Sequence, residues 1–355
     1  MTKELRIGAW PKAKNAAYNP YQKLLYDSID RIEGVSVLEF SPKALLKVHS
    51  YDLIHIHWPD AYLANGRGWK VWLRYFVLRA IFALARLRSI PIVWTAHNLK
   101  RDGQRHERLM NSLFWPWFFG AISGVIYMTK ASESAAKTIS PRLKDIPSAV
   151  IPHGHYRPVL SRQDNRESRE VLSSDIPKIL FFGSVTRYKN VYKILAAFKD
   201  LPPGSAELKI RGKMSEVEPE EILASMVEDL PEQYRRHFEF DNRFLSENEL
   251  EQAVQEADLV VFPYSDVLNS GSAIFALSVG RPILVSDNSL SRELLEYVGS
   301  DWIYLIDGEL DAGQLERAGQ KAKMLCASGT MPDLSALEWD LIGRKTVDLY
   351  RKVVG

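Results

Sequence analysis

Three segments in the first half of the chain place histidines at the ends of apolar runs: HIHWPD at 55–60, TAHNL at 95–99 and IPHGHY at 151–156. An imidazole beyond a strand can take the proton of a substrate hydroxyl, and a carboxylate can do so once partial burial raises its pKa. We select Asp60 as the first candidate for a catalytic base, His57 as the second, and His97 as a further candidate. His55 shares a strand face with His57, and a structural role fits it better.

Two segments of the second half carry residue types that bind phosphate. FFGSVTRYKN at 181–190 combines a small turn with two cations, and NSGS at 269–272 opens a helix whose positive dipole end favours an anion. Helix capping alone explains the asparagine and the first serine, but not the glycine and the second serine. We therefore predict a diphosphate site. Its candidate residues are Gly183, Ser184, Arg187, Lys189, Asn269, Ser270, Gly271 and Ser272.

Other kinds of site are disfavoured by the residue counts. The chain has one cysteine, Cys326, which excludes internal disulfides and sites built from several thiolates. His55 and His57 could supply two metal ligands, but no third ligand stands at a recognisable spacing, so we expect no metal. The composition, with 46% apolar and 25% charged residues, is globular and excludes disorder and coiled coil.

Short apolar runs alternate with helical patterns, which is typical of βαβ units and parallel sheets. The sequence predicts an α/β protein with a first domain at 1–160, a second at 175–333 and a terminal helix at 334–355. Ligands bind beyond the carboxyl ends of parallel strands, so the candidate residues of each half should share one edge of its sheet. The expected strands are Arg6–Ala9, Val35–Phe40, Leu53–His57, Ile92–Ala96, Gly124–Met128, Ala149–Ile151, Lys178–Phe182, Glu207–Arg211, Phe238–Phe240, Leu259–Phe262, Ile283–Val285 and Ile303–Ile306.

Charge is unevenly divided along the chain. Residues 1–150 carry 22 Lys and Arg against 11 Asp and Glu, a net +11, whereas the remainder carries 24 against 33, a net −9. A basic half fits nucleic acid, an anionic membrane or a phosphorylated substrate. Nucleic acid ranks last, because no motif that reads bases is recognisable and the cations are interleaved with bulky apolar rings.

Residues 66–88 hold six of the basic residues, no acidic residue and many aromatic ones. On a helix, Trp72, Phe76 and Arg79 would present rings beside guanidinium groups, as in an interfacial membrane helix. A core helix with a solvated basic edge is an equal alternative, and the neighbouring FWPWFF cluster at 114–119 favours the membrane. No run reaches the ~18 apolar residues of a spanning helix, and no signal peptide is recognisable. We expect a cytoplasmic protein, peripheral on the inner face of the plasma membrane.

The order of these motifs, continued by AVQEADLVVFPYSD at 253–266 and by the final helix WDLIGRKTVDLY at 339–350, resembles the GT-B glycosyltransferases of the family 4-like kind. The resemblance implies two Rossmann-like domains facing a cleft, with a nucleotide-sugar donor on the second domain, an acceptor on the first and no obligatory metal. It matches Arg187 and Lys189 to the diphosphate-binding pair and 270–272 to the loop under the sugar phosphates. His97 matches the histidine that faces the donor sugar.

The sequence departs from the family pattern at the positions of two paired glutamates. The paired glutamates of the family would fall at Val267 and Phe275, and neither is acidic, although Asp266 lies one position away. The chain is similar in this to bacterial exopolysaccharide transferases of the xanthan type. That similarity implies inverting transfer of mannose from GDP-mannose to a polyprenyl-diphosphate-linked oligosaccharide. A transferase of glucuronic acid or another hexose from UDP, and a non-catalytic protein that binds nucleotide sugar or membrane, are the alternatives.

Overall fold

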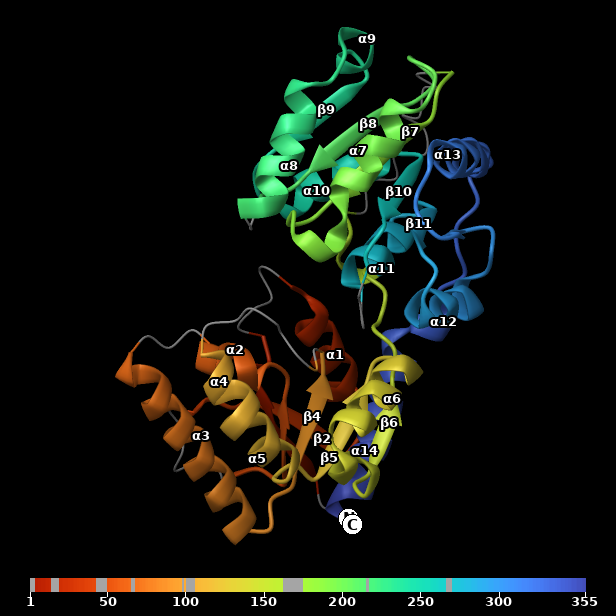
Figure 1. The fold of residues 1–355 in the computed structure, drawn as a ribbon. Helices are drawn as coiled ribbons and strands as arrows, with labels where there is room; N and C mark the ends of the chain where they lie inside the picture. The colour runs from red at the N-terminus through yellow and green to blue at the C-terminus, as the bar shows by residue number, and fades with distance from the viewer. Residues whose placement is uncertain are drawn as a thin grey trace. The chain divides into compact units, whose positions relative to one another are not determined.

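The computed structural model describes residues 4–13, 19–42, 50–64, 68–97, 99, 106–161, 175–214, 217–265 and 270–355. The chain forms two compact units, one of Met1–Gly154 with Leu337–Gly355 and the other of His155–Ala336. Each unit contains a six-stranded parallel sheet flanked by helices (Figure 1). Most of the linker expected at 161–170 lies outside the described residues.

The sheet of the first unit has the strand order β2-β1-β3-β4-β5-β6. The chain order reverses between β1 and β3, and ligands of parallel α/β sheets bind at such a switch point. In the register of β3 and β4, His55 lies opposite Val93, so the residues that follow these two strands are neighbours. The strands are β1 (Leu5–Trp10), β2 (Val35–Glu39), β3 (Leu53–Ile56), β4 (Ile92–Ala96), β5 (Gly124–Tyr127) and β6 (Ser148–Val150).

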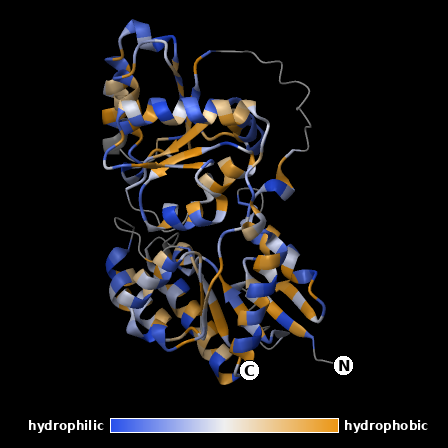
Figure 2. Ribbon diagram, turned by 90° about the vertical axis from the view of Figure 1, so that its right-hand side faces the viewer, coloured by the Kyte–Doolittle hydropathy of each residue, from blue (hydrophilic) through white to orange (hydrophobic). Residues whose placement is uncertain are grey.

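The sheet of the second unit has the order β12-β11-β10-β7-β8-β9, with the switch point between β7 and β10. Its strands are β7 (Lys178–Phe182), β8 (Glu207–Arg211), β9 (Phe238–Asp241), β10 (Leu259–Phe262), β11 (Ile283–Ser286) and β12 (Ile303–Ile306). The predicted α/β class is confirmed, and all twelve expected strands are present with ends within one residue of those expected. The strands of both sheets are predominantly apolar (Figure 2), as expected for sheets that helices cover.

Helices follow most of the strands. In the first unit they are α1 (Tyr21–Asp30), α2 (Pro59–Ala64), α3 (Trp69–Leu87), α4 (Glu107–Leu109), α5 (Trp115–Phe119), α6 (Lys130–Ile139) and α14 (Trp339–Val354). In the second unit they are α7 (Val191–Lys199), α8 (Val217–Glu228), α9 (Glu232–Arg235), α10 (Glu247–Glu256), α11 (Gly271–Ser278), α12 (Ser289–Val298) and α13 (Ala312–Ala327).

The terminal helix α14 returns to the first unit, as the resemblance implies, and packs against α1 and the β5–β6 edge (Figure 1). Gly343 permits this close approach, because a Cβ at this position would lie 2.6 Å from the hydroxyl oxygen of Ser28 on α1. An ion pair between Arg31 and Asp340, with an N–O distance of 2.6 Å, joins the same two helices at the surface. The chain is thus tied back to the sheet on which it began.

The FWPWFF cluster belongs to the core of the first unit. Trp115, Phe118 and Phe119 are buried and pack around Trp94 of β4, with the ring centroids of the two tryptophans 5.8 Å apart, and the buried ring of Phe114 stacks on Phe118. The cluster therefore gives no support to membrane contact. Among the described residues, no helix combines the length and apolar character required to cross a bilayer.

Candidate active site

In the first unit, hydrogen bonds join the histidines that follow β3 and β4 to a tyrosine of α1. The hydroxyl oxygen of Tyr26 lies 2.9 Å from Nδ1 of His55 and 2.6 Å from Nε2 of His57. Nδ1 of His57 lies 2.9 Å from Nε2 of His97, just past the end of β4. A continuous chain of hydrogen bonds therefore runs from α1 through the sheet to His97.

At the other end of this series of hydrogen bonds, His55 also contacts residues of β4 and α14. Nε2 of His55 lies 2.8 Å from the Thr95 hydroxyl oxygen, and Nδ1 of His55 lies 2.7 Å from the Tyr350 hydroxyl oxygen. Burial lowers the pKa of His55 to about 3, so the imidazole is neutral at physiological pH. These contacts join two helices and two strands through one side chain, which is a structural arrangement.

His57 is also held neutral. Its side chain is 1% exposed, and burial lowers its pKa well below the ordinary value, with smaller contributions from His55 and His97. Both of its ring nitrogens have hydrogen-bond partners inside the protein, Tyr26 at Nε2 and His97 at Nδ1. A neutral, enclosed imidazole is suited to orienting a neighbour rather than to meeting a substrate.

His97 is the more accessible end of the chain. Its half-buried ring stacks on Trp58 with a centroid distance of 4.2 Å, and the ring of Tyr21 meets it edge to face at 5.2 Å. Together with the bond to His57, these rings fix the plane of the imidazole. The geometry therefore presents a pre-oriented imidazole beyond β4 of the first unit.

The other histidine and acidic candidates have different surroundings. Asp60 lies in the first turn of α2 and is 4% exposed. His153 follows β6 and packs on Tyr21 at 4.6 Å between ring centroids, so that Tyr21 contacts both His97 and His153. Burial lowers the pKa of His153 to about 4. His155 belongs to the second unit, and residue 98 lies outside the described residues.

In the second unit, the predicted phosphate-binding residues at 183–189 follow β7, beside the end of β8. Gly183 has a φ of +116°, and a Cβ there would lie 3.0 Å from Nζ of Lys189. Gly212, which follows β8, has a φ of +155°, and its Cβ would lie 1.9 Å from the carbonyl oxygen of Gly183. Two glycines thus allow the backbones to meet and place a lysine ammonium against them.

Lys189 is the buried cation of this site. Its side chain is 8% exposed, its Nζ lies 5.4 Å from the centre of the Tyr264 ring, and burial lowers its pKa to about 8. Arg187 lies in the same 3₁₀ turn and is exposed, and Ser184 is half-buried. A desolvated ammonium gains more from an anion than a hydrated one, so Lys189 is suited to a diphosphate.

Hydrogen bonds hold this turn against the loop after β10. The side-chain amide of Asn190 donates to the carbonyl oxygen of Pro263 over 2.8 Å, and the backbone N–H of Ser265 donates to the carbonyl oxygen of Tyr188 over 2.9 Å. The two chain segments meet at the switch point of the sheet. The turn that carries the cations and the segment 263–265 after β10 are therefore brought together.

The helix α11 begins as the sequence predicts. Ser270 caps it by accepting a hydrogen bond from the backbone N–H of Ala273 over 3.2 Å, and Gly271 and Ser272 are its first two residues. The predicted residues Asn269, Val267 and Asp266 lie outside the described residues. Phe275, at the position of the family's second glutamate, packs against Phe182 and Tyr156 with centroid distances of 6.0 and 5.6 Å.

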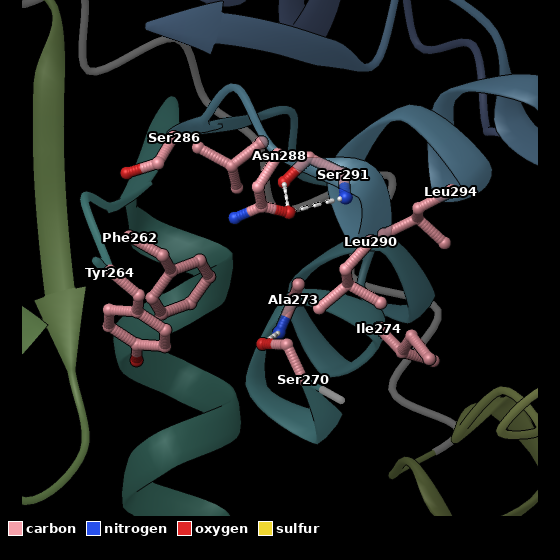
Figure 3. Close-up of a pocket in the computed structure, with 11 residues that line it drawn as sticks. Phe262, Tyr264, Ser270, Ala273, Ile274, Ser286, Asn288, Leu290, Ser291 and Leu294 are labelled. Atoms are coloured by element: carbon pink, nitrogen blue, oxygen red, sulfur yellow. Dashed lines mark hydrogen bonds between the residues drawn. The ribbon is translucent and has the colours of Figure 1, made fainter. Parts of the chain in front are cut away.

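A pocket lies beside these residues, at the carboxyl ends of β10 and β11 and between the N-terminal ends of α11 and α12 (Figure 3). Tyr264 and Ser270 line the pocket, so the pocket adjoins the Tyr264 ring over which the Lys189 ammonium lies. Asn288 caps α12 at its rim by accepting from the backbone N–H of Ser291 over 2.9 Å (Figure 3). The other lining residues are Phe262, Ala273, Ile274, Val285, Ser286, Leu290 and Leu294.

Several residues of both sites escaped the sequence analysis. Tyr21, Tyr26 and Tyr350 come from helices whose apolar faces would accommodate a tyrosine as ordinary core, so no local signal marks their hydroxyls. Tyr264, in the segment VVFPYSD, directly follows a predicted strand and could have been selected by that position. Within the described parts of the chain, no cluster of three His, Cys, Asp or Glu residues could hold a metal ion.

No protein-family model matches the chain. The chain is similar to the GDP-mannose:glycolipid 4-beta-D-mannosyltransferase of Xanthomonas campestris pv. campestris, with 28% identity over 345 residues, 96% of this chain and 90% of that protein. Among solved structures, it is similar to Anabaena HepE in complex with UDP, at 14% identity and a TM-score of 0.67, covering 98% of this chain and 100% of that one.

A sucrose-phosphate synthase from Thermosynechococcus elongatus is also similar in structure, with 18% identity and a TM-score of 0.63 over 99% of both chains. The trehalose 6-phosphate synthase of Burkholderia multivorans matches over 99% of both chains at 12% identity and a TM-score of 0.62. The strand orders of both units and the returning terminal helix agree with the fold that the motifs resemble. The chain therefore has the GT-B fold.

Proposed function

We propose that the protein is an inverting, metal-independent mannosyltransferase that transfers mannose from GDP-mannose to a polyprenyl-diphosphate-linked oligosaccharide in exopolysaccharide synthesis. The observation that carries this proposal is the 28% identity, over 96% of the chain, with a transferase described as using GDP-mannose and a glycolipid. The donor-binding groups are Lys189 and Arg187, the backbone at 183–184 and the start of α11.

In the reaction, the acceptor oxygen forms a bond to the anomeric carbon while the bond from that carbon to the donor phosphate breaks. The leaving diphosphate gains negative charge, which the ammonium of Lys189, the guanidinium of Arg187 and the N-terminal dipole of α11 stabilise. No acidic side chain replaces the second glutamate of the family, because Phe275 occupies that position. Inversion in one displacement requires instead a base that takes the acceptor proton.

The base candidates differ in their surroundings. Asp60 is 4% exposed, and His57 is enclosed with both nitrogens hydrogen-bonded. His97 is half-buried, is clamped by two rings and has Nε2 committed to His57. This geometry favours His97 as the base over the sequence-based first choice, Asp60.

The direct test is turnover with purified protein, GDP-mannose and a synthetic polyprenyl-diphosphate oligosaccharide, with the anomeric configuration of the product read by NMR. A β-linked mannoside supports the proposal, and an α-linked product refutes inversion. The removal of divalent cations with EDTA should leave the rate unchanged.

A UDP-sugar donor is the second candidate, since Anabaena HepE, similar in fold, is described in complex with UDP. Thermal shifts with GDP-mannose, UDP-glucose and UDP-glucuronic acid separate the donors, because a ligand that binds only the folded state raises its melting temperature. Binding of a nucleotide sugar without any transfer would favour the non-catalytic alternative.

The proposed lipid-linked acceptor requires the protein to reach a membrane, and α3 carries the surface for it. The helix buries one face on the core through Val71, Leu78 and Ile81, yet its opposite face is apolar as well. Trp72 is 46% exposed and Phe76 is 61% exposed. The α3 face is defined by the exposed side chains Trp69, Trp72, Leu73, Phe76 and Leu87.

Cations flank the α3 face, and residues 66–88 contain no acidic side chain, so an anionic lipid surface is the complementary partner. Arg74 and Arg79 are poor sites for a charge test, because Arg74 donates to the Tyr62 carbonyl over 2.9 Å and Arg79 donates to the Tyr75 hydroxyl over 3.1 Å. Lys70 and Arg86 are exposed and suit charge reversal better.

Sedimentation with phosphatidylglycerol and phosphatidylcholine vesicles tests this surface. We expect binding to the anionic vesicles that weakens with salt and is lost in Trp72→Ser/Phe76→Ser and in Lys70→Glu/Arg86→Glu. Met324→Ser, which removes a similarly exposed apolar side chain from α13, is the matched control and should bind like the wild type. Equal binding to both vesicle types, or equal loss in the control, would contradict the assignment.

A further inference from the structure

The two hydrogen bonds of His57 constrain where protons can sit in the histidine cluster. A neutral imidazole has one N–H and one lone pair, so His57 donates at one ring nitrogen and accepts at the other. Its partners are Tyr26, 2.6 Å from Nε2, and His97, 2.9 Å from Nδ1. The proton positions of the three residues are therefore coupled, and the chain of bonds can point in only two directions.

Only one of these two hydrogen-bond directions is compatible with transfer of a proton to His97. A protonated imidazole carries N–H at both nitrogens and can only donate, so a protonated His97 must donate from Nε2 to Nδ1 of His57. His57 then carries its own proton on Nε2 and donates to the Tyr26 hydroxyl oxygen. Tyr26 in turn donates to Nδ1 of His55, 2.9 Å away, so the donors of His97, His57 and Tyr26 each have an acceptor; the same nitrogen also lies 2.7 Å from the Tyr350 hydroxyl oxygen.

We propose that His57, held by Tyr26, is a positioning residue that keeps His97 in the tautomer with its proton on Nε2, so that Nδ1 of His97 accepts the proton of the acceptor hydroxyl. The inference rests on the proposed glycosyl transfer with His97 as the base. When the hydrogen bonds from His97 through His57 to Tyr26 already run in this direction, no donor has to reorient as His97 takes up the proton. The proton passes from His97 to solvent after the new glycosidic bond has formed, which restores the resting state.

The surroundings of His57 support this role. Burial lowers its pKa well below the ordinary value, so His57 stays neutral while His97 becomes charged, and no second cation opposes the transfer. Tyr26 is fully buried, and burial raises its pKa well above the ordinary value, so its hydroxyl keeps a proton for His55. Trp58 and Tyr21 fix the ring plane of His97, and the His57 bond engages its Nε2.

Two tyrosine variants separate positioning from simple stability. Tyr26→Phe removes the oxygen that accepts from Nε2–H of His57, which favours the reversed chain, in which His97 carries its proton on Nδ1. We expect kcat to fall about ten- to hundredfold with the KM for GDP-mannose unchanged. Tyr51→Phe is the matched control, because it removes a buried tyrosine hydroxyl of the same unit that donates to the Glu39 carbonyl oxygen over 3.2 Å, outside the histidine cluster, and it should retain the wild-type kcat. His57→Asn, which keeps an acceptor oxygen, should retain more activity than His57→Leu.

The tautomer itself is read by ¹⁵N NMR of histidine-labelled protein, which requires no turnover. We expect the proton of His97 on Nε2 in the wild type and in Tyr51→Phe, and a shift toward Nδ1 in Tyr26→Phe. A proton on Nδ1 of His97 in the wild type, or an equal loss of kcat in both tyrosine variants, would overturn the inference. Absence of mannosyl transfer by the wild type would refute the proposed function instead, and the spectra would still decide the tautomer.

Discussion

Raising the pH from 7 to 9 should weaken the binding of GDP-mannose about tenfold, because Lys189 loses its charge in this interval. The side chain is 8% exposed, and burial lowers its pKa to about 8 in the unliganded protein. The ammonium form is therefore dominant at pH 7 and minor at pH 9. A bound diphosphate raises the pKa of Lys189 again, so above pH 8 binding must take up a proton, and the affinity falls by about a factor of ten for each further pH unit.

A rise in pH acts through Lys189 in the opposite direction on stability: it weakens donor binding but raises the free energy of unfolding. In the unfolded chain Lys189 keeps its proton up to its ordinary pKa of 10.5, so between pH 8 and pH 10.5 the unfolded state binds more protons than the native state. This side chain therefore contributes a rise in the free energy of unfolding over that interval. Weaker donor binding above pH 8 cannot then be ascribed to a loss of folded protein caused by this group.

Isothermal titration calorimetry at pH 7, 8 and 9 measures the effect. Lys189→Arg keeps its charge over this range and should show little pH dependence, and it corrects for any titration of the nucleotide. Lys189→Met should bind GDP-mannose about tenfold more weakly than the wild type at pH 7, and its affinity should lack the pH dependence that Lys189 causes. Lys193→Gln, at a half-buried lysine paired with Glu309, should behave like the wild type. A wild-type slope equal to that of Lys189→Arg, or full affinity in Lys189→Met, would refute the assignment.

Three further variants test the packing and the base. Gly212→Ala would drive a Cβ to 1.9 Å from the Gly183 carbonyl oxygen, and should lower the free energy of unfolding by about 2 kcal/mol or more in urea and abolish GDP binding. Gly343→Leu should push α14 away from Ser28 on α1 and cost about 1–3 kcal/mol, measured in the same way. Asp60→Asn should leave turnover near the wild type if His97 is the base, whereas a drop of about 10²- to 10⁴-fold with intact donor binding would restore Asp60 as the first choice.

The elements of this protein are predictable because their patterns are local. Each of the twelve strands is a short apolar run, and a run such as Ile92–Ala96 is bounded by residues that end it, so periodicity and turn residues suffice. The start of α11 is equally local, since Ser270 caps a helix that begins one residue later. The ends of parallel strands also share an edge of the sheet, which placed His57 and His97 together without a structure.

The contacts that give these residues their roles are not local. Tyr350 reaches His55 across 295 positions of the chain, and nothing in the final helix distinguishes its hydroxyl from the apolar face on which it sits. The FWPWFF cluster shows the converse error, because its composition fits a membrane surface, whereas Phe118 is fully buried against Trp94 and Phe114 is fully buried against Phe118. Hydrophobic composition predicts that a segment is apolar but does not say whether protein or lipid covers it.

The surroundings of Phe275 explain why a phenylalanine fits at the position where the family pattern has a glutamate. At the position where the resemblance implies a glutamate, the ring packs against Phe182 at the end of β7 and against Tyr156, which also bonds to α11 through its backbone N–H and the Ser278 hydroxyl oxygen, 2.8 Å away. A carboxylate at this position would lie among aromatic rings and would carry a desolvation penalty. The loss of the acid is therefore accompanied by a matching apolar environment. Under the proposed function, donor recognition in this unit would then depend on Lys189, on its neighbouring backbone and on the start of α11, and proton transfer would fall to a residue of the first unit.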